Sequence, residues 1–291
     1  MPAGGPQVVR TVADLRAQVR AWRNESRRIG LVPTMGALHE GHLSLVRQSM
    51  RECDRTVVSI FVNPTQFAPS EDFDSYPRGE ADDLAKLAAI GAHLVFAPDR
   101  AEIYADGFAT TVTVSGVSEG LCSVTRPHFF QGVATVVTKL LLQCLPDRAY
   151  FGEKDYQQLQ VIRRLTRDLD IPVEIIAVPT VREPDGLAMS SRNAYLSAEH
   201  RSRAPLLYTT MRAVAERVMQ GEPVRAALAR GRDMLAENGF DPIDYLEIRE
   251  AGTLAPIEDG WDPARPARVF AAAYLGETRL IDNIPVEAAE S

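Results

Sequence analysis

Short runs of β-branched and aliphatic residues alternate with longer amphipathic stretches over the first 180 residues. The apolar runs are continuous, as expected of strands that are covered on both faces of a parallel sheet. They predict strands at Ile29–Val32, Thr56–Val62, Leu94–Ala97, Arg148–Phe151 and Val173–Val178. Apolar residues at spacings of three and four predict helices at Thr11–Ala21, His39–Cys53, Glu80–Ile90, Gly132–Leu145 and Asp155–Asp168. This order indicates an α/β domain with a Rossmann-like parallel sheet.

The pattern changes after Thr180, where Pro184, Asp185 and Gly186 interrupt the chain. Two Ala- and Arg-rich amphipathic stretches then predict helices at Ala198–Met219 and Val224–Glu237, and shorter apolar runs predict strands at Ile243–Ile248, Ala267–Leu275 and Thr278–Asp282. We therefore expect two domains: a Rossmann-like domain over residues 1–181 and a smaller C-terminal α+β domain over residues 182–291.

Composition narrows the functional classes. The 291 residues are 45% hydrophobic and 24% charged, as in an ordinary soluble globular protein, and the net charge is −7. An acidic chain without a block of Lys or Arg lacks the electrostatic footprint of a nucleic-acid binder. Cys53, Cys122 and Cys144 are odd in number and widely spaced, which favours a reducing, cytoplasmic location over a disulfide framework or a cysteine zinc site. Neither a membrane span nor a signal peptide is predicted.

The first candidate for chemistry is the segment PTMGALHEGH, residues 33–42, between the first predicted core strand and the next helix. Ligands of parallel α/β sheets bind at the carboxyl ends of strands, and a helix N-terminus attracts phosphate. His39 and His42 are three residues apart and share a helix face, while Gly41 leaves room for a nucleotide. The alternatives are two surface histidines or a metal site, although the spacing is one residue short of the zinc-protease His-Glu-x-x-His.

Two further polar segments are candidates for chemistry, one after the predicted strand Arg148–Phe151 and one after Pro184-Asp185-Gly186. In GEKDYQQ, residues 152–158, Lys154 suits a phosphate and Asp155 suits ribose hydroxyls, although acidic residues also simply favour a helix start. Tyr156 and Gln158 project about 200° apart on a helix, so they do not serve the same pocket, and we expect Gln158 to face the ligand. In MSSRN, residues 189–193, two hydroxyls and a guanidinium on a mobile loop can close over a triphosphate; the alternative is a polar capping loop.

Six collinear motifs carry a resemblance over nearly the whole chain: PTMGALHEGH (33–42), SIFVNPTQF (59–67), YPR (76–78), GEKDYQQL (152–159), PTVREPDGLAMSSRN (179–193) and TRLIDN (278–283). Together they resemble the pantothenate synthetase family, the pantoate–β-alanine ligases. His39-Glu40-Gly41-His42 is similar to the His-x-Gly-His signature of the nucleotidyltransferase superfamily that includes class I aminoacyl-tRNA synthetases.

The resemblance implies a set of site residues. It implies ATP binding by Met35, Gly36, Ala37, Leu38, His39, Glu40, Gly41, His42, Gly152, Glu153, Lys154, Asp155, Val181, Met189, Ser190, Ser191 and Arg192. It implies that His42 is the proton donor and that His39, Lys154 and Arg192 stabilise the negative charge of the phosphates. It assigns pantoate to Gln66 and Gln158, and β-alanine to Gln66, with Asn63 shaping the pantoate pocket and Asp82 and Asp83 as supporting residues.

One segment departs from the family pattern Arg-Pro-x-His-Phe-x-Gly-Val. Here Arg126 keeps its place, but Phe129 stands where the histidine is expected, and His128 comes one residue earlier. A substrate role for His128 is therefore not implied. The alternatives are that a shifted loop delivers it to the site or that it only caps the helix predicted to begin near Gly132.

The implied reaction is the ATP-dependent condensation of pantoate with β-alanine. The pantoate carboxylate attacks the α-phosphate of ATP and gives pantoyl-adenylate and pyrophosphate; the amine of β-alanine then displaces AMP. Positioning and electrostatics suffice for the first step. Mg²⁺ is expected through the ATP phosphates, without protein ligands, and the resemblance suggests a homodimer.

Three other functions remain in competition at this point. A nucleotidyltransferase acting on a phosphate acceptor such as phosphopantetheine would need more cationic groups than the uncharged Gln66 and Gln158 offer. A nucleotide-binding regulator without catalysis would not need the set of His39, His42, Lys154 and Arg192. A metallohydrolase would need a third His or Cys near the histidine pair.

Overall fold

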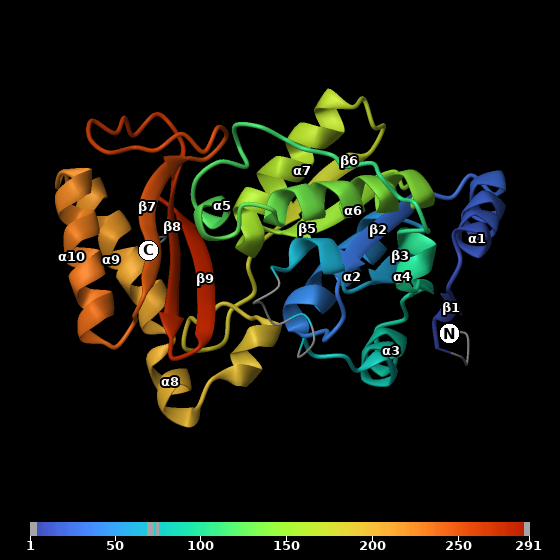
Figure 1. Ribbon diagram of the computed structural model, residues 1–291, viewed down its shortest axis with the longest axis horizontal. Coiled ribbons are helices and arrows are strands. Elements are labelled where there is room, and N and C mark those ends of the chain that lie inside the picture. The colour runs from blue at the N-terminus through green and yellow to red at the C-terminus, as the bar shows by residue number, and fades with distance from the viewer. Residues whose placement is uncertain (1–4, 69–72, 74–75, 288–291) are drawn as a thin grey trace. The chain divides into compact units, whose positions relative to one another are not determined.

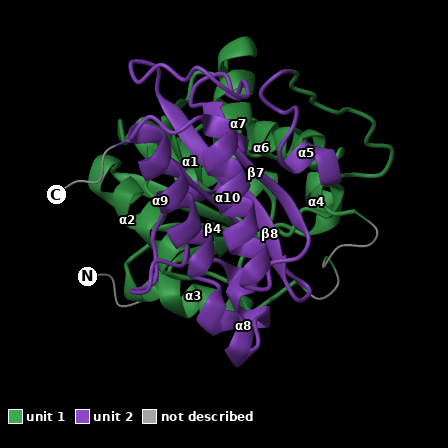
Figure 2. Ribbon diagram, turned by 90° about the vertical axis from the view of Figure 1, so that its left-hand side faces the viewer, with its two compact units in different colours: residues 1–115, 126–153, 158–179 green, residues 116–125, 154–157, 180–291 purple. Residues whose placement is uncertain are grey.

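The computed structural model describes residues 5–68, 73 and 76–287 (Figure 1). The chain forms two compact units (Figure 2). Unit 1 comprises residues 1–115, 126–153 and 158–179, and unit 2 comprises residues 116–125, 154–157 and 180–291. Two short internal segments thus belong with the C-terminal part of the chain. The contiguous domain division expected at residues 181 and 182 stays a prediction.

Unit 1 is built on a parallel sheet with the strand order β1-β4-β3-β2-β5-β6. Its strands are β1 (Gln7–Val9), β2 (Ile29–Thr34), β3 (Arg55–Ile60), β4 (Leu94–Phe96), β5 (Arg148–Gly152) and β6 (Glu174–Val178). The predicted parallel α/β sheet is confirmed. The three-residue β1 pairs with β4 in register from Gln7 with Leu94 to Val9 with Phe96, and it is too short to stand out from the sequence pattern.

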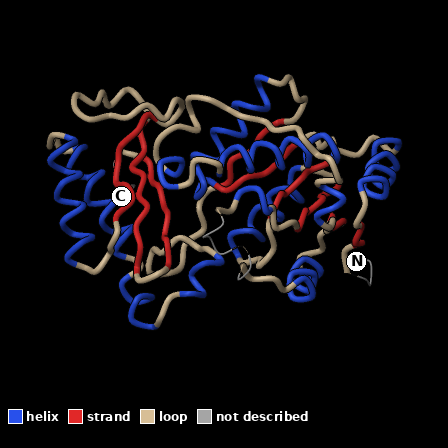
Figure 3. The backbone as a smooth tube through the Cα atoms, in the orientation of Figure 1, coloured by secondary structure: helices blue, strands red, loops and turns tan. Residues whose placement is uncertain are grey.

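The helices of this part of the chain connect successive strands (Figure 3). They are α1 (Val12–Asn24), α2 (Glu40–Glu52), α3 (Glu80–Ala89), α4 (Arg100–Ile103), α6 (Phe129–Cys144) and α7 (Tyr156–Asp168), with the 3₁₀ turns η1 (Pro64–Gln66) and η2 (Glu153–Asp155). Val46 of α2 is fully buried among Val32, Val58 and Val95 of the sheet, so the apolar stripe of α2 faces the strands, as its spacing predicts.

Unit 2 contains an antiparallel sheet of β7 (Ile243–Glu250), β8 (Ala267–Leu275) and β9 (Thr278–Pro285), with β8 in the centre. Its helices are α5 (Cys122–Thr125), α8 (Ala198–Arg203), α9 (Leu206–Met219) and α10 (Val224–Glu237), and η3 (Ser191–Tyr195) is a 3₁₀ turn. Gly231 lets α10 approach closely, because a Cβ there would lie 2.6 Å from Val214 and 2.7 Å from Leu246. The predicted small α+β unit is confirmed.

Several element boundaries differ from the prediction. The single helix expected over Ala198–Met219 is broken into α8 and α9 at Pro205, which has no backbone N–H to donate to the preceding helical turn. Helix α6 begins at Phe129, three residues before the expected Gly132. Within the part of the chain that the structure describes, no helix is long and apolar enough to cross a membrane.

Candidate active site

The topology of unit 1 marks one position as a ligand site. β2 lies between β3 and β5, so the chain leaves β2 towards one edge of the sheet and returns later to β5 on the other side. The carboxyl ends of β2, at Thr34, and β5, at Gly152, flank this switch point, where ligands of open parallel sheets bind. The segments PTMGALHEGH (33–42) and GEKDYQQ (152–158) begin at these two strand ends.

The turn after β2 is held by two side chains of α3. Gly36 and Ala37 have positive φ values of 84° and 50°. The carboxylate of Asp83 accepts hydrogen bonds from the backbone N–H groups of Ala37, at 2.9 Å, and Leu38, at 2.7 Å. Lys86 Nζ donates to the carbonyl oxygen of Leu38 at 2.8 Å. Burial raises the pKa of Asp83, and the two amide donors oppose that rise. Asp83 is thus a supporting residue of this turn.

His39 and His42 lie side by side at the N-terminus of α2. Their ring centroids are 4.1 Å apart. Nδ1 of His39 accepts a hydrogen bond from Gly41 N, and Nδ1 of His42 accepts one from His39 N. Because each Nδ1 is an acceptor, the neutral rings carry their protons on Nε2. The first turn of α2 therefore combines two imidazole donors with the positive end of a helix dipole, which suits a phosphate. The two rings share a face, as predicted.

Gln66 lies in η1, just after β3, and its side chain is fixed. Its Nε2 contacts Met35 Sδ at 3.0 Å, and its Oε1 accepts a hydrogen bond from Asn63 Nδ2 at 3.1 Å. Gln66 is 8% exposed. The structure thus brings Gln66 next to Met35 at the start of the first motif, although the two are 31 residues apart in sequence.

Asn63 organises the turn that carries Gln66. It is 1% exposed. Its Nδ2 also donates to Gly132 O at 3.1 Å, and its Oδ1 accepts from the hydroxyls of Tyr104, at 2.8 Å, and Thr65, at 2.9 Å. A Cβ at Gly132 would lie 2.4 Å from Thr65 O, so α6 packs directly on this turn. The predicted shaping role of Asn63 has a physical basis in these bonds, while its relation to pantoate stays a prediction.

Residues 126–133, whose sequence departs from the family pattern, take a defined conformation. Arg126 stacks on the ring of Phe129, at 3.9 Å from its centroid, and donates to Gln66 O at 3.2 Å. His128 occupies the N-cap position of α6, but its side chain makes no capping hydrogen bond. The expectation that His128 caps this helix is therefore confirmed in its N-cap position, which precedes Phe129 rather than Gly132, and no side-chain bond adds to it. Its Nε2 is buried without a hydrogen-bond partner.

In unit 2, Lys154 and Asp155 form the turn that leads into α7. Lys154 Nζ lies 4.0 Å from Asp155 Oδ2, and their side chains are 18% and 44% exposed. The carbonyl oxygen of Lys154 accepts a hydrogen bond from Asn283 Nδ2 at 2.9 Å. Tyr156 packs against Phe270 with ring centroids 5.9 Å apart, so it is part of the packing of unit 2. Gln158 is half-buried, and its role in pantoate binding stays a prediction.

Gln157 is a structural residue that the sequence analysis missed. Its Nε2 donates to the carbonyl oxygens of Val117, Glu119 and Gly120 at 3.1–3.4 Å, and its Oε1 accepts from Cys122 N at 3.2 Å. It is 5% exposed and ties segment 116–125 to the start of α7. No local pattern signals this role, because the partners are some 35 to 40 residues away.

The segment MSSRN, residues 189–193, follows a closed hairpin rather than an irregular loop. Met189 N donates to Val181 O at 3.0 Å, and Glu183 N donates to Leu187 O at 2.8 Å. Gly186, with a φ of 94°, completes the turn. The hairpin places the two predicted nucleotide contacts Val181 and Met189 beside each other. Ser190 Oγ then accepts from Arg192 N at 3.3 Å and caps η3.

The predicted site residues thus fall into two groups. Unit 1 holds Met35–His42, Asn63, Gln66, Gly152, Glu153 and Gln158, and unit 2 holds Lys154, Asp155, Val181 and Met189–Arg192. Asp82 is 74% exposed at its side chain and pairs with Lys86. Among the residues that the structure describes, no group of three or more His, Cys, Asp or Glu side chains is arranged to hold a metal ion.

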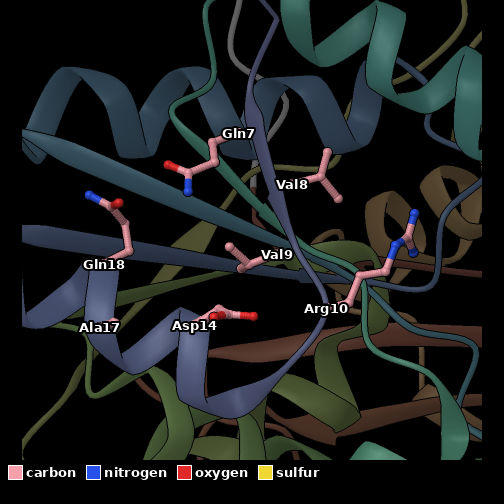
Figure 4. A pocket seen from close by; sticks show the side chains of 7 residues that line it. All are labelled: Gln7, Val8, Val9, Arg10, Asp14, Ala17 and Gln18. Atoms are coloured by element: carbon pink, nitrogen blue, oxygen red, sulfur yellow. The ribbon is translucent and has the colours of Figure 1, made fainter.

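A surface hollow of about 640 Å³ lies between β1 and α1 and is a poor ligand site (Figure 4). Its lining residues are Gln7, Val8, Val9, Arg10, Asp14, Ala17 and Gln18. Its two charged side chains have partners, since Arg10 bonds to Glu80 and Asp14 accepts from Thr11 Oγ1. None of the predicted site residues lines it.

Comparison with known proteins connects these features to one family. The sequence profile of the family "Pantoate-beta-alanine ligase" matches residues 7–285. "Pantothenate synthetase" of Paramagnetospirillum magneticum is 60% identical over 96% of this chain and 98% of its own, and that of Rhodospirillum rubrum is 59% identical over 96% and 98%.

Solved structures agree. The crystal structure of pantoate-beta-alanine (pantothenate synthetase) from Thermus thermophilus has a TM-score of 0.90 at 49% identity and covers 97% of this chain and 100% of its own. The ligase from Francisella tularensis, complexed with beta-gamma ATP and beta-alanine, has a TM-score of 0.80 at 33% identity, with 98% and 100% covered. This chain, with its paired histidines at the switch point, belongs to the pantoate–β-alanine ligase family.

Proposed function

We propose that this chain condenses pantoate with β-alanine to form pantothenate at the expense of ATP, which is cleaved to AMP and pyrophosphate. The observation that carries the proposal is the pair of adjacent imidazoles, His39 and His42, at the N-terminus of α2 beside the switch point, in a chain that matches the family over residues 7–285. A helix N-terminus with two additional N–H donors is built for the phosphates of a nucleotide.

The first step is adenylation of pantoate. Its carboxylate attacks the α-phosphorus of ATP, and the bond to the β-phosphate bridging oxygen breaks and releases pyrophosphate. The Nε2–H groups of His39 and His42 donate hydrogen bonds to phosphate oxygens, and His42 is the proton donor that shares its Nε2 proton with the developing charge in such a hydrogen bond. Lys154 and Arg192 add positive charge to offset repulsion between two anions.

The second step is amide formation. The neutral amine of β-alanine attacks the acyl carbon of pantoyl-adenylate, and AMP leaves with the electron pair of the broken acyl–oxygen bond. Gln66 and Gln158 hold the hydroxylated acid without adding charge, and Gln66 also contacts β-alanine. The support for Gln66 is its fixed position beside Met35, because an oriented amide fixes the acyl group for attack.

We propose MgATP as the nucleotide substrate. Mg²⁺ dehydrates reluctantly and is commonly bound through substrate phosphates. The donor set fits this, because both carboxylate oxygens of buried Asp83 already accept backbone hydrogen bonds. The ion would screen the phosphate charge. We further propose a homodimer acting in the cytoplasm, on the strength of the family relationship and the three buried, free cysteines. Light scattering at several protein concentrations tests the dimer.

The test is pantoate-dependent exchange of labelled pyrophosphate into ATP, with Mg²⁺ present and β-alanine omitted. We expect exchange in the wild type and a loss of about 100-fold or more in His42→Ala. His200→Ala is the matched histidine control and keeps the wild-type rate. ATP binding without pantoate-dependent exchange would contradict adenylation and favour transfer to a phosphate acceptor such as phosphopantetheine.

A further inference from the structure

The motif Thr278–Asn283 on β9 has no part in the chemistry above, yet two polar residues at its end are buried. Asp282 is 5% exposed and Asn283 is 2% exposed. β9 is an edge strand of the antiparallel sheet, and successive side chains of a strand leave on opposite faces. Asp282 and Asn283 therefore reach two different segments of unit 2.

Asp282 holds the hairpin of residues 181–189, which precedes Ser190–Arg192. Its two carboxylate oxygens accept hydrogen bonds from Arg182 at 2.6 and 3.0 Å. Arg182 pairs with Ala188 across the hairpin and donates to Gly186 O at 3.1 Å. One guanidinium thus connects both hairpin strands to β9. Arg182 follows Val181 in the sequence, and Ala188 precedes Met189, so the ion pair fixes the backbone beside both predicted nucleotide contacts.

Asn283 holds the Lys154 turn. Its Nδ2 donates to Lys154 O at 2.9 Å, and its Oδ1 accepts from Arg268 Nε at 2.7 Å. Arg268 in turn lies 4.2 Å from the ring centroid of Tyr156, the first residue of α7. Asn283 thereby fixes the backbone from which the Lys154 side chain leaves.

We infer that Asp282 and Asn283 are positioning residues, which hold Lys154 and the 181–189 hairpin in one fixed arrangement for binding the ATP triphosphate. The inference rests on the proposed function, since it takes both segments to contact ATP. Two adjacent residues of one strand set both segments, so a displacement of either lowers affinity for the nucleotide without removing a group that contacts it. Such misplacement costs about 10- to 100-fold in rate or affinity.

The experiment compares three isosteric substitutions in the full chain. Asp282→Asn removes the charge and one of the parallel bonds to Arg182. Asn283→Asp keeps the bond to Arg268 but places an oxygen against Lys154 O. Asp244→Asn is the matched control, because Asp244 also has a buried carboxylate, 8% exposed, in an ion pair with an arginine of the same sheet, Arg279, at 2.7 Å.

Titration calorimetry with MgATP alone is the primary measurement, and melting temperature is the second. We expect Asp282→Asn and Asn283→Asp to weaken ATP binding about tenfold or more, and Asp244→Asn to lower the melting temperature while leaving ATP affinity within about twofold. Equal ATP affinity in all four proteins, or an equal loss in Asp244→Asn, overturns the inference. If Asp282→Asn does not fold, Arg182→Lys replaces it, because it keeps the charge but loses the paired geometry.

Pyrophosphate exchange on the same samples separates the two proposals. A wild type that binds ATP but shows no pantoate-dependent exchange contradicts the proposed function, while the affinities of the variants still decide the role of Asp282 and Asn283. A wild type that does not bind MgATP overturns both.

Discussion

Asp83 Oδ1 accepts a hydrogen bond from the backbone N–H of Leu38 at 2.7 Å, across 45 residues of sequence. Its other oxygen bonds the N–H of Ala37. The turn in which Gly36 and Ala37 take positive φ is therefore shaped by a buried carboxylate of α3. His39 follows this turn directly, so the orientation of the imidazole pair depends on a residue to which we assign no substrate contact.

Replacing Asp83 with Ala tests this dependence. The substitution leaves the buried N–H of Leu38 and the part-buried N–H of Ala37 without acceptors, which costs about 2 to 4 kcal/mol of the free energy of unfolding. We expect weaker ATP binding as well, because the turn no longer sets the start of α2. Urea unfolding and ATP titration measure both effects. Asp82→Ala, at a side chain that is 74% exposed, should change stability by about 0.5 kcal/mol or less. Equal losses in the two variants would contradict the assignment.

Asn63 and Tyr104 offer a graded test of the Gln66 turn. Asn63→Ala removes the bonds to Gln66, Gly132, Thr65 and Tyr104 together and should cost about 3 kcal/mol or more, with a raised KM for pantoate. Tyr104→Phe removes one donor and should cost about 1 kcal/mol, with a smaller rise in that KM. An unchanged KM for pantoate in Asn63→Ala would exclude a link between this turn and the acid substrate.

Substitutions at two glycines distinguish a glycine that protein packing requires from one that a bound ligand requires. Gly132→Ala forces a Cβ to within 2.4 Å of Thr65 O and should destabilise the fold by about 2 kcal/mol or more. At Gly152, nothing in the described protein lies within 4 Å of an added Cβ, and φ is outside the left-handed region. Gly152→Ala should therefore fold normally and yet bind ATP more weakly, since only a ligand would meet the methyl group. Wild-type ATP affinity in Gly152→Ala would remove this residue from the nucleotide site.

The buried thiol of Cys144 predicts how the stability of the fold depends on pH. Burial raises its pKa from the ordinary 9.0 to about 12. Between these values the unfolded chain has lost the thiol proton and the folded chain keeps it. The stability contributed by this group is thus fully present below pH 9 and is lost as the pH rises towards 12.

Alkylation measures how well the fold protects the Cys144 thiol from reaction. Because the thiolate is the nucleophile, Cys144 in the folded protein should resist iodoacetamide at about pH 8 and react after unfolding in urea, as read by peptide mass spectrometry. The stability advantage of the wild type over Cys144→Ala should shrink above pH 9. Rapid labelling of Cys144 in the folded protein would contradict both expectations.

The parallel sheet could be predicted because strands buried on both faces leave continuous apolar runs, as at Ile29–Val32. The break before α9 also had a signal, Pro205, which the amphipathic pattern on both sides obscured. The start of α6 at Phe129 had none, since the residues before Gly132 are aromatic and polar without a periodicity. Gln157 joins segments 116–125 and 154–157 to each other, and contacts such as that of Tyr156 with Phe270 join them to the rest of unit 2. Local patterns do not encode these tertiary contacts.

The motif residues of the candidate site could be proposed from sequence, because strand ends carrying His, Lys and Gln are chemically conspicuous. Their supports could not be ranked. Asn63, Asp83 and Gln157 act through backbone groups far along the chain, and a sequence does not show which amide a buried carboxylate or carboxamide will meet. The side-chain conformation of His128 could not be predicted for the same reason. Its N-cap position follows from the helix start, but its rotamer is set by packing.

The discontinuity of unit 2 limits how this protein can be rearranged. The chain passes between the two units five times, at 115/116, 125/126, 153/154, 157/158 and 179/180. A fragment beginning at Thr180 would lack Tyr156 against Phe270 and Cys122 against Tyr245. The C-terminal part is thus no transferable cassette: a recombination joint near residue 180 would splice together two incomplete cores, so exchange between relatives must carry all three segments along.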